Sequence, residues 1–212
     1  MRKYLFLNLL IIFFSNCTKD YLLDVTVSPP LSGIVSPESG SYKEGSTVSI
    51  VATPNPEYEF VGWSGDETGS ANLLSFEINS NKNIIAQFQK RKYNLKINIL
   101  GEGTVSEEII SSSKNSDYES GTIVRLTAIP SLGYYFTGWS NDVSGDTNPV
   151  EININRAKTI TAKFEKKSYN LEIKVEGEGT VEEEIIETGK STDYLFGTKV
   201  KLTPKPSEGW DF

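Results

Sequence analysis

A 76-residue internal repeat constrains the fold of this chain more than any other feature. Landmark residues recur at that interval, among them Gly45, Gly121 and Gly197. Four further sets share it: Tyr42, Tyr118 and Tyr194; Phe60, Phe136 and Phe212; Trp63 and Trp139; Phe88 and Phe164. A fixed period predicts an array in which each copy is one structural unit. Copy one has a shorter loop, because seven positions separate its Val35 from Tyr42, where thirteen separate Val105 from Tyr118.

Apolar and polar residues alternate within each copy. In the second copy the alternation runs through residues 93–99, 124–128, 150–154 and 160–164. A period of two predicts half-buried strands, and the clusters of Gly, Pro, Asn, Asp and Ser between these runs predict turns. The best helical candidate after the N-terminal segment, residues 181–188, is short and acidic. We therefore expect an all-β fold made of tandem small antiparallel β-sheet repeats.

Each copy should contain five or six strands. Parallel pairing is not expected, because parallel neighbours need a crossover of about a dozen or more residues. The predicted units are repeat 1 at 22–90, repeat 2 at 91–166 and an incomplete repeat 3 at 167–212. By the period, a Gly and a Trp would follow Phe212, so the chain is expected to be a fragment whose truncated third repeat packs poorly.

The first residues are typical of an export signal. Arg2 and Lys3 precede an almost wholly apolar stretch, residues 4–14, which is too short to span a bilayer core of about 30 Å. The predicted signal peptide is 1–16, followed by a tether at 17–21. Cys17 is the only cysteine of the chain. It is either an incidental thiol beside an ordinary cleavage site or a residue with a dedicated role.

This segment resembles a bacterial lipoprotein signal, in which the cysteine is lipidated and becomes the new N-terminus. Ser15 fits that pattern, whereas Phe14 and Asn16 depart from it. The resemblance implies lipid attachment at Cys17 and an exported protein, anchored at the outer membrane or the cell surface. Acyl chains would hold it there, because each buried methylene contributes about 0.8 kcal/mol.

The composition argues against catalysis and against nucleic acid as a partner. The chain has no His, so Ser-His and Cys-His nucleophile pairs are excluded, and His/Cys zinc sites cannot be assembled. The net charge of −7 repels phosphate backbones. We expect no enzyme activity, no cofactor, no metal and no small-molecule substrate.

Several motifs have a second interpretation. The Gly-Glu-Gly segments at 101–103 and 177–179 suggest a phosphate loop, but a strand rather than a helix follows, which favours a turn. Acidic loops at 142–146 and 64–67 could offer oxygens to Ca²⁺, although Asp and Gly are also ordinary turn residues. Glu107 and Glu108 should point to opposite faces of a strand. The run 182–184 is expected to be a solvated edge.

An aromatic motif at 57–63 and 133–139 is expected to stabilise each small core. Its Gly, at position 62 or 138, is expected to let the chain turn before the Trp. Trp63 and Trp139 then either cap the core of their own repeat, which the fixed spacing favours, or form exposed ligand-binding platforms for a glycan.

Four features together resemble the divergent internalin-B-type repeat, also called the bacterial repeat domain. They are Gly-x-Gly-x-Val (101–105), Tyr-x-x-Gly (118–121), Gly-Tyr-x-Phe-x-Gly-Trp (133–139) and Ala-x-Phe (162–164). Repeat 1 lacks the first Gly of the turn and the Gly before Tyr58. The resemblance covers about residues 22–212 and implies extracellular adhesion or spacer arrays without catalytic residues.

Three hypotheses follow. The repeats are a spacer and interaction (adhesin-like) array held by the lipid anchor, or they bind an extracellular glycan or protein themselves. Alternatively, they are the stalk of a surface enzyme whose catalytic domain lies beyond residue 212.

Overall fold

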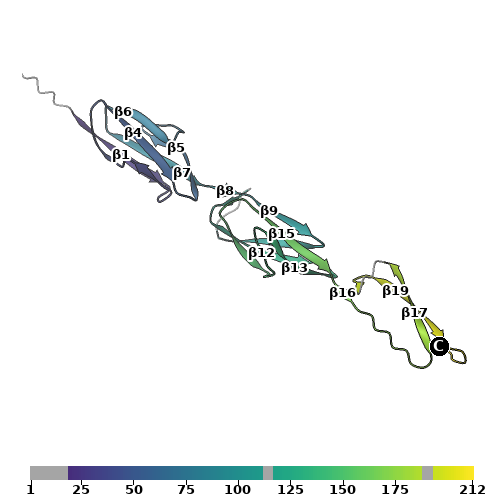
Figure 1. The fold of residues 1–212 in the computed structure, drawn as a ribbon. Coiled ribbons are helices and arrows are strands. Elements are labelled where there is room, and N and C mark those ends of the chain that lie inside the picture. Colours follow the sequence, from purple (N-terminus) through teal and green to yellow (C-terminus); the bar gives the residue numbers. More distant parts are fainter. Residues whose placement is uncertain (1–18, 112–116, 188–192) are drawn as a thin grey trace, which may run out of the picture. The chain divides into compact units, whose positions relative to one another are not determined.

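The structure, a computed structural model, describes residues 19–111, 117–187 and 193–212 (Figure 1). These residues form strands, turns and bends, and none of them lies in a helix. The all-β prediction is therefore confirmed. The chain divides into two compact units, Met1–Lys90 and Arg91–Phe212, and each is described by itself.

Repeat 1 contains seven strands in two sheets. Their bounds are β1 Asp20–Ser28, β2 Gly33–Ser36, β3 Gly40–Lys43, β4 Ser46–Pro54, β5 Tyr58–Gly65, β6 Leu73–Ile78 and β7 Lys82–Lys90. One sheet has the order β3-β1-β7-β5 and the other β2-β4-β6. The expected tether at 17–21 is shorter than predicted, because Asp20 and Tyr21 already pair with Lys43 and Tyr42.

The expectation of antiparallel pairing alone was wrong. Strand β1 pairs with β7 in parallel, from Leu23 opposite Lys82 to Ser28 opposite Gln87. The crossover that parallel strands need is supplied by the rest of the repeat, since β2 to β6 lie between the two strands in the chain. The first and last strands of the repeat therefore meet at the centre of one sheet.

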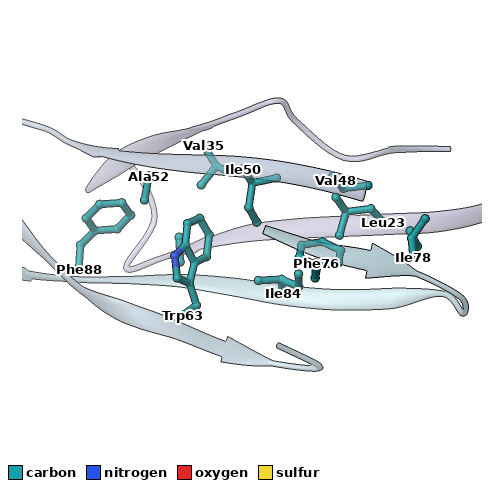
Figure 2. Packing of buried hydrophobic residues seen from close by; sticks show 11 residues of the cluster. Leu23, Val35, Val48, Ile50, Ala52, Trp63, Phe76, Ile78, Ile84 and Phe88 are labelled. Atoms are coloured by element: carbon teal, nitrogen blue, oxygen red, sulfur yellow. The ribbon is translucent and has the colours of Figure 1, made fainter. Parts of the chain in front are cut away.

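The core of repeat 1 lies between the two sheets. Figure 2 shows apolar side chains from both sheets pointing toward one another. Alternation decides which face contributes: on β4, Val48, Ile50 and Ala52 are buried, whereas Ser49 and Val51 are exposed. The buried cluster is Leu23, Val35, Val48, Ile50, Ala52, Trp63, Phe76, Ile78, Ile84, Ala86 and Phe88.

Repeat 2 has the same plan. Its strands are β8 Lys92–Tyr93, β9 Leu95–Leu100, β10 Gly103–Ser111, β11 Tyr118–Glu119, β12 Thr122–Pro130, β13 Tyr134–Asn141, β14 Val150–Ile154 and β15 Lys158–Lys166. The sheets are β13-β15-β9 and β10-β12-β14, with β8 paired to β11. Strands β9 and β15 are again parallel. The buried cluster consists of Tyr118, Val124, Leu126, Ala128, Trp139, Ile152, Ile154, Ile160, Ala162 and Phe164.

The glycine of the aromatic motif makes a bulge and not the predicted turn. The register between β5 and β7 shifts between Phe60 and Gly62, and that between β13 and β15 shifts at the equivalent place. Without the extra residue, Phe60 and Trp63 would face opposite sides, because their spacing is odd. The bulge brings both rings to the inner face, with their centroids 5.2 Å apart.

The described residues of repeat 3 form two strand pairs. Strands β17 Gly179–Glu187 and β19 Lys199–Pro206 form a hairpin, and β16 Ser168–Tyr169 pairs with β18 Tyr194–Leu195. The short helical candidate at 181–188 is thus a strand as far as Glu187. Apolar side chains of repeat 3 line an open depression of about 470 Å³, among them Leu171, Tyr194, Phe196, Val200 and Leu202.

Candidate functional site

The two motif tryptophans lie in the cores of their repeats. Trp63 and Trp139 are each only 4% exposed. The indole Nε1–H of Trp63 donates to the Ala71 carbonyl at 2.8 Å, and that of Trp139 donates to the Thr147 carbonyl at 2.9 Å. The ligand-binding assignment of these two residues needs correction, because a stacking platform requires an exposed ring face and neither indole offers one here.

The Gly-Glu-Gly segment of repeat 2 is the turn between β9 and β10. Gly101 has a φ of +85°, which lies in the left-handed region. A Cβ on Gly103 would come within 2.7 Å of the Phe164 ring, so this position accepts no side chain. A strand follows directly, and no helix N-terminus is present there to hold a phosphate.

The acidic loops use aspartate carboxylates to bind the backbone of a neighbouring strand. Asp142 accepts the Thr159 backbone N–H at 2.6 Å and binds Arg156 at 2.6 Å. The Thr159 hydrogen bond, assisted by Arg156, lowers the pKa of Asp142. In repeat 1, Asp66 accepts the Asn83 backbone N–H at 2.7 Å. Across the described parts of the chain, no three Asp, Glu or Cys side chains are grouped for a metal ion.

The adjacent acids on β10 point to opposite faces. Glu107 accepts a hydrogen bond from the Tyr118 hydroxyl, and Glu108 binds Arg125 at 3.0 Å on the outer face. Arg125 also binds Glu151 at 2.8 Å, and the hydrogen bonds that the guanidinium donates to Glu151 and then to Glu108 raise its pKa. This geometry does not bring two carboxylates together for acid-base chemistry.

The run at 182–184 contributes to a charge ladder on the hairpin of repeat 3. Ion pairs join Glu182 to Lys205, Glu184 to Lys201 and Glu187 to Lys199. All six side chains are more than half exposed, so each pair contributes little to stability.

The tyrosine that pairs with Glu107 is a feature that the motif analysis missed. Tyr118 is 2% exposed beneath β10. Its spacing from Glu107 recurs between Glu183 and Tyr194, which is the signal that could have revealed it. Repeat 1 has Tyr42 but no carboxylate at the matching position, where Pro37 stands.

The predicted signal peptide and the lipid-attachment residue Cys17 lie outside the described residues. Within the described residues, no helix is long and apolar enough to cross a membrane.

Comparison with known families decides what the two complete repeats are. The family profile for the divergent InlB B-repeat domain matches residues 23–92 and again residues 93–168. The chain belongs to the divergent InlB B-repeat family. The two InlB-type repeats abut without a gap, and the family is typically extracellular or surface-associated. No curated protein and no solved structure matches the chain.

Proposed function

We propose that this chain is a lipid-anchored bacterial surface protein whose InlB-type repeats act as a spacer and interaction array. The observation that carries the proposal is that each complete repeat closes its own core and the next follows at once. Strand β7 ends at Lys90 and β8 begins at Lys92. Because each added unit brings its own core, units in direct succession lengthen a protein without rearranging the units before them, which is what a spacer requires.

The short distance between Cys17 and β1 supports this role. Only Thr18 and Lys19 separate the cysteine from Asp20, the first residue of β1. At about 3.4 Å per residue, the three steps from Cys17 to Asp20 span roughly 10 Å. A lipid on Cys17 would therefore hold repeat 1 close to the membrane, and the repeats themselves would provide the reach.

A non-catalytic role is part of the proposal. The chain contains no His, and its single Cys is the proposed lipid-attachment residue. The carboxylates of Asp142, Glu107 and Glu108 hold a strand end, a tyrosine hydroxyl and a cationic side chain, respectively.

Fractionation of a bacterium expressing the chain tests the anchor. The wild type is expected in the membrane fraction, carrying a labelled acyl chain, and Cys17→Ala is expected in the soluble fraction without label. Thr18→Ala is the matched control and should stay with the membrane, because it keeps the thiol. Membrane retention of Cys17→Ala would refute lipid anchoring. Protease digestion of intact cells tests surface exposure, and protection of the repeats would contradict it.

A further inference from the structure

Repeat 1 has an open sheet edge at a place where repeats 2 and 3 place a strand of their own. In repeat 2, β10 runs along β12 as far as Ser111 opposite Ile123. In repeat 3, β17 likewise reaches Glu187 opposite Lys199. In repeat 1, β2 ends at Ser36, opposite Val51 of β4. The N-terminal half of β4, residues 46–50, therefore has no strand beside it on that side among the described residues.

The backbone of β4 has free hydrogen-bonding groups along this edge. Ala52 donates its N–H to the Asn72 carbonyl, on the β6 side. Successive residues of a strand direct their N–H and C=O groups to opposite sides, so Thr47 and Ser49 direct theirs away from β6. Neither residue has a paired strand on that side within the described chain. Unpaired groups of this kind are the template for adding a strand.

Tyr42 of the same repeat, the counterpart of Tyr118, also lacks among the described residues the hydrogen-bond partner that Tyr118 has. Tyr118 in repeat 2 donates to Glu107 of β10 and is buried. Tyr42, at the equivalent position, is only partly buried and has no hydrogen-bond partner among the described residues. The loss of cover follows from the shorter β2, because the residue that would carry the carboxylate is missing from the sheet. An incoming peptide can therefore accept a hydrogen bond from the Tyr42 hydroxyl, in addition to the hydrogen bonds that it makes with the β4 backbone.

We propose that the β4 edge of repeat 1 at Thr47 and Ser49, together with the hydroxyl of Tyr42 on β3, binds an extended peptide strand of a partner protein. The peptide carries a carboxylate side chain two residues before a branched apolar side chain. The sister repeats define this chemistry, because Glu107 and Ile109 of β10 lie opposite Leu126 and Val124. The matching residues of repeat 1 are Ile50 and Val48, which are both buried.

The outer face of the edge needs no second charge on the peptide. Arg125, which binds Glu108 in repeat 2, is replaced by Ser49, whose hydroxyl lies 2.7 Å from that of Ser75. Repeat 1 has eight acidic and only three basic residues between positions 22 and 90, so an acidic run would be repelled. The occupant therefore has one carboxylate. Residues 1–18 contain no Asp or Glu and do not meet this requirement.

This inference deepens the interaction part of the proposed function and is independent of the lipid anchor. The probe is a synthetic peptide, blocked at both termini, with the sequence of residues 107–111 and the change Glu108→Ser, because β2 already occupies the place that residues 104–106 would take. Its partner in the experiment is the full chain in detergent solution. The expected readout is amide hydrogen exchange: Thr47 and Ser49 exchange fast in the free chain and become protected with the peptide. Ile123 and Arg125, the equivalent positions of repeat 2, are protected throughout.

Two variants test the tyrosine. Tyr42→Phe is expected to weaken peptide binding roughly tenfold, the effect of losing a hydrogen bond to a charged group. A peptide with Glu107→Gln should bind the wild-type chain more weakly by a similar factor. The same peptide change should weaken binding to the Tyr42→Phe chain only slightly further, since both changes remove the same hydrogen bond. Tyr118→Phe is the matched control and should leave the affinity unchanged, because Glu107 of the chain occupies that hydroxyl.

Three results would overturn the proposal. The first is that the amides of Thr47 and Ser49 stay unprotected at saturating peptide. The second is that Tyr42→Phe and Glu107→Gln weaken peptide binding independently of each other. The third is that Tyr118→Phe weakens peptide binding as much as Tyr42→Phe does. Protection of the same amides that rises with protein concentration, without peptide, would also overturn it and would assign the edge to a second copy of this chain. None of these results bears on membrane retention, so the anchor is judged separately.

Discussion

A single backbone position before β2 and its counterparts distinguishes repeat 1 from the others. Leu31 has a φ of +64°, and the equivalent Gly101 and Gly177 have φ values of +85° and +92°. A non-glycine residue in this left-handed region costs about 1–2 kcal/mol. Leu31 is also 88% exposed, so its side chain contributes little burial in return. Repeat 1 therefore carries local strain that its sisters avoid.

Leu31→Gly is expected to raise the free energy of unfolding of repeat 1 by about 1 kcal/mol, since it removes the strain and loses little burial. The Leu31 carbonyl still accepts the hydrogen bond from Asn55. Urea denaturation measures the change. Leu132→Gly is the control: Leu132 is 87% exposed but has no positive φ, so glycine there should lower stability slightly. A loss of stability in Leu31→Gly would contradict the strain.

Residue roles were predictable where they depend on local spacing. The aromatic motif at 57–63 was expected to stabilise the small core, and the structure packs its Tyr58 and Phe60 against the core of repeat 1. The absence of a side chain at Gly103 depends instead on Phe164, which arrives from the far end of the repeat. The spacing of residues in the sequence does not reveal that Phe164 packs against Gly103, so the reason for the glycine could not be predicted.

At the level of elements, aspartates bridge the loops after β5 and β13 to the start of β7 and β15. Asp142 binds the Thr159 N–H and Arg156, and the pKa of its carboxyl is lowered in the folded chain, first by the Thr159 hydrogen bond. A lowered folded pKa means that the ionised form stabilises the fold above the ordinary carboxyl pKa. That contribution is lost as pH falls through the folded pKa.

Asp142→Asn is therefore expected to destabilise repeat 2 at neutral pH and to be nearly silent in acid, where the wild-type carboxyl is protonated as well. Urea denaturation of both proteins at neutral pH and at a pH below the lowered pKa of the folded Asp142 carboxyl checks this. Asp146→Asn is the control, since Asp146 is an exposed residue of the same loop. If added calcium stabilises the wild type but not Asp142→Asn, Asp142 binds a metal ion instead of holding the loop to β15, and the metal-binding alternative is favoured.

The strands themselves were predictable from alternation, and their pairing was not. Three of the four predicted runs in repeat 2 lie within single strands, such as 150–154 with β14, whereas the run 93–99 is divided between β8 and β9 at Asn94. The parallel pair β1 and β7 joins the two ends of a repeat, and no local pattern signals which strands meet across that distance. The bulge at Gly62 was missed for a related reason: it is defined by the register against β7.

At the scale of the whole chain, stability is distributed by repeat. The buried cluster of repeat 1 contains only residues of repeat 1, and that of repeat 2 only residues of repeat 2. In repeat 3, Ile186, Trp210 and Phe212 are more than half exposed, and Tyr194 is its only buried apolar residue among those described. Units with separate cores should unfold separately, and repeat 3 should show the weakest protection against amide exchange.

Trp139→Ala tests this separation. Removing a buried tryptophan costs about 3–5 kcal/mol, and here it also leaves the Thr147 carbonyl without its indole donor. Amide exchange is expected to rise throughout β10, β12, β13 and β15, while the amides of β4 and β7 keep their wild-type protection. Trp210→Ala is the matched control, because Trp210 is 52% exposed and its loss should change neither set. If β4 and β7 lose protection together with repeat 2, the two repeats are one cooperative unit. The short connection between Lys90 and Lys92 would then transmit stability as well as length.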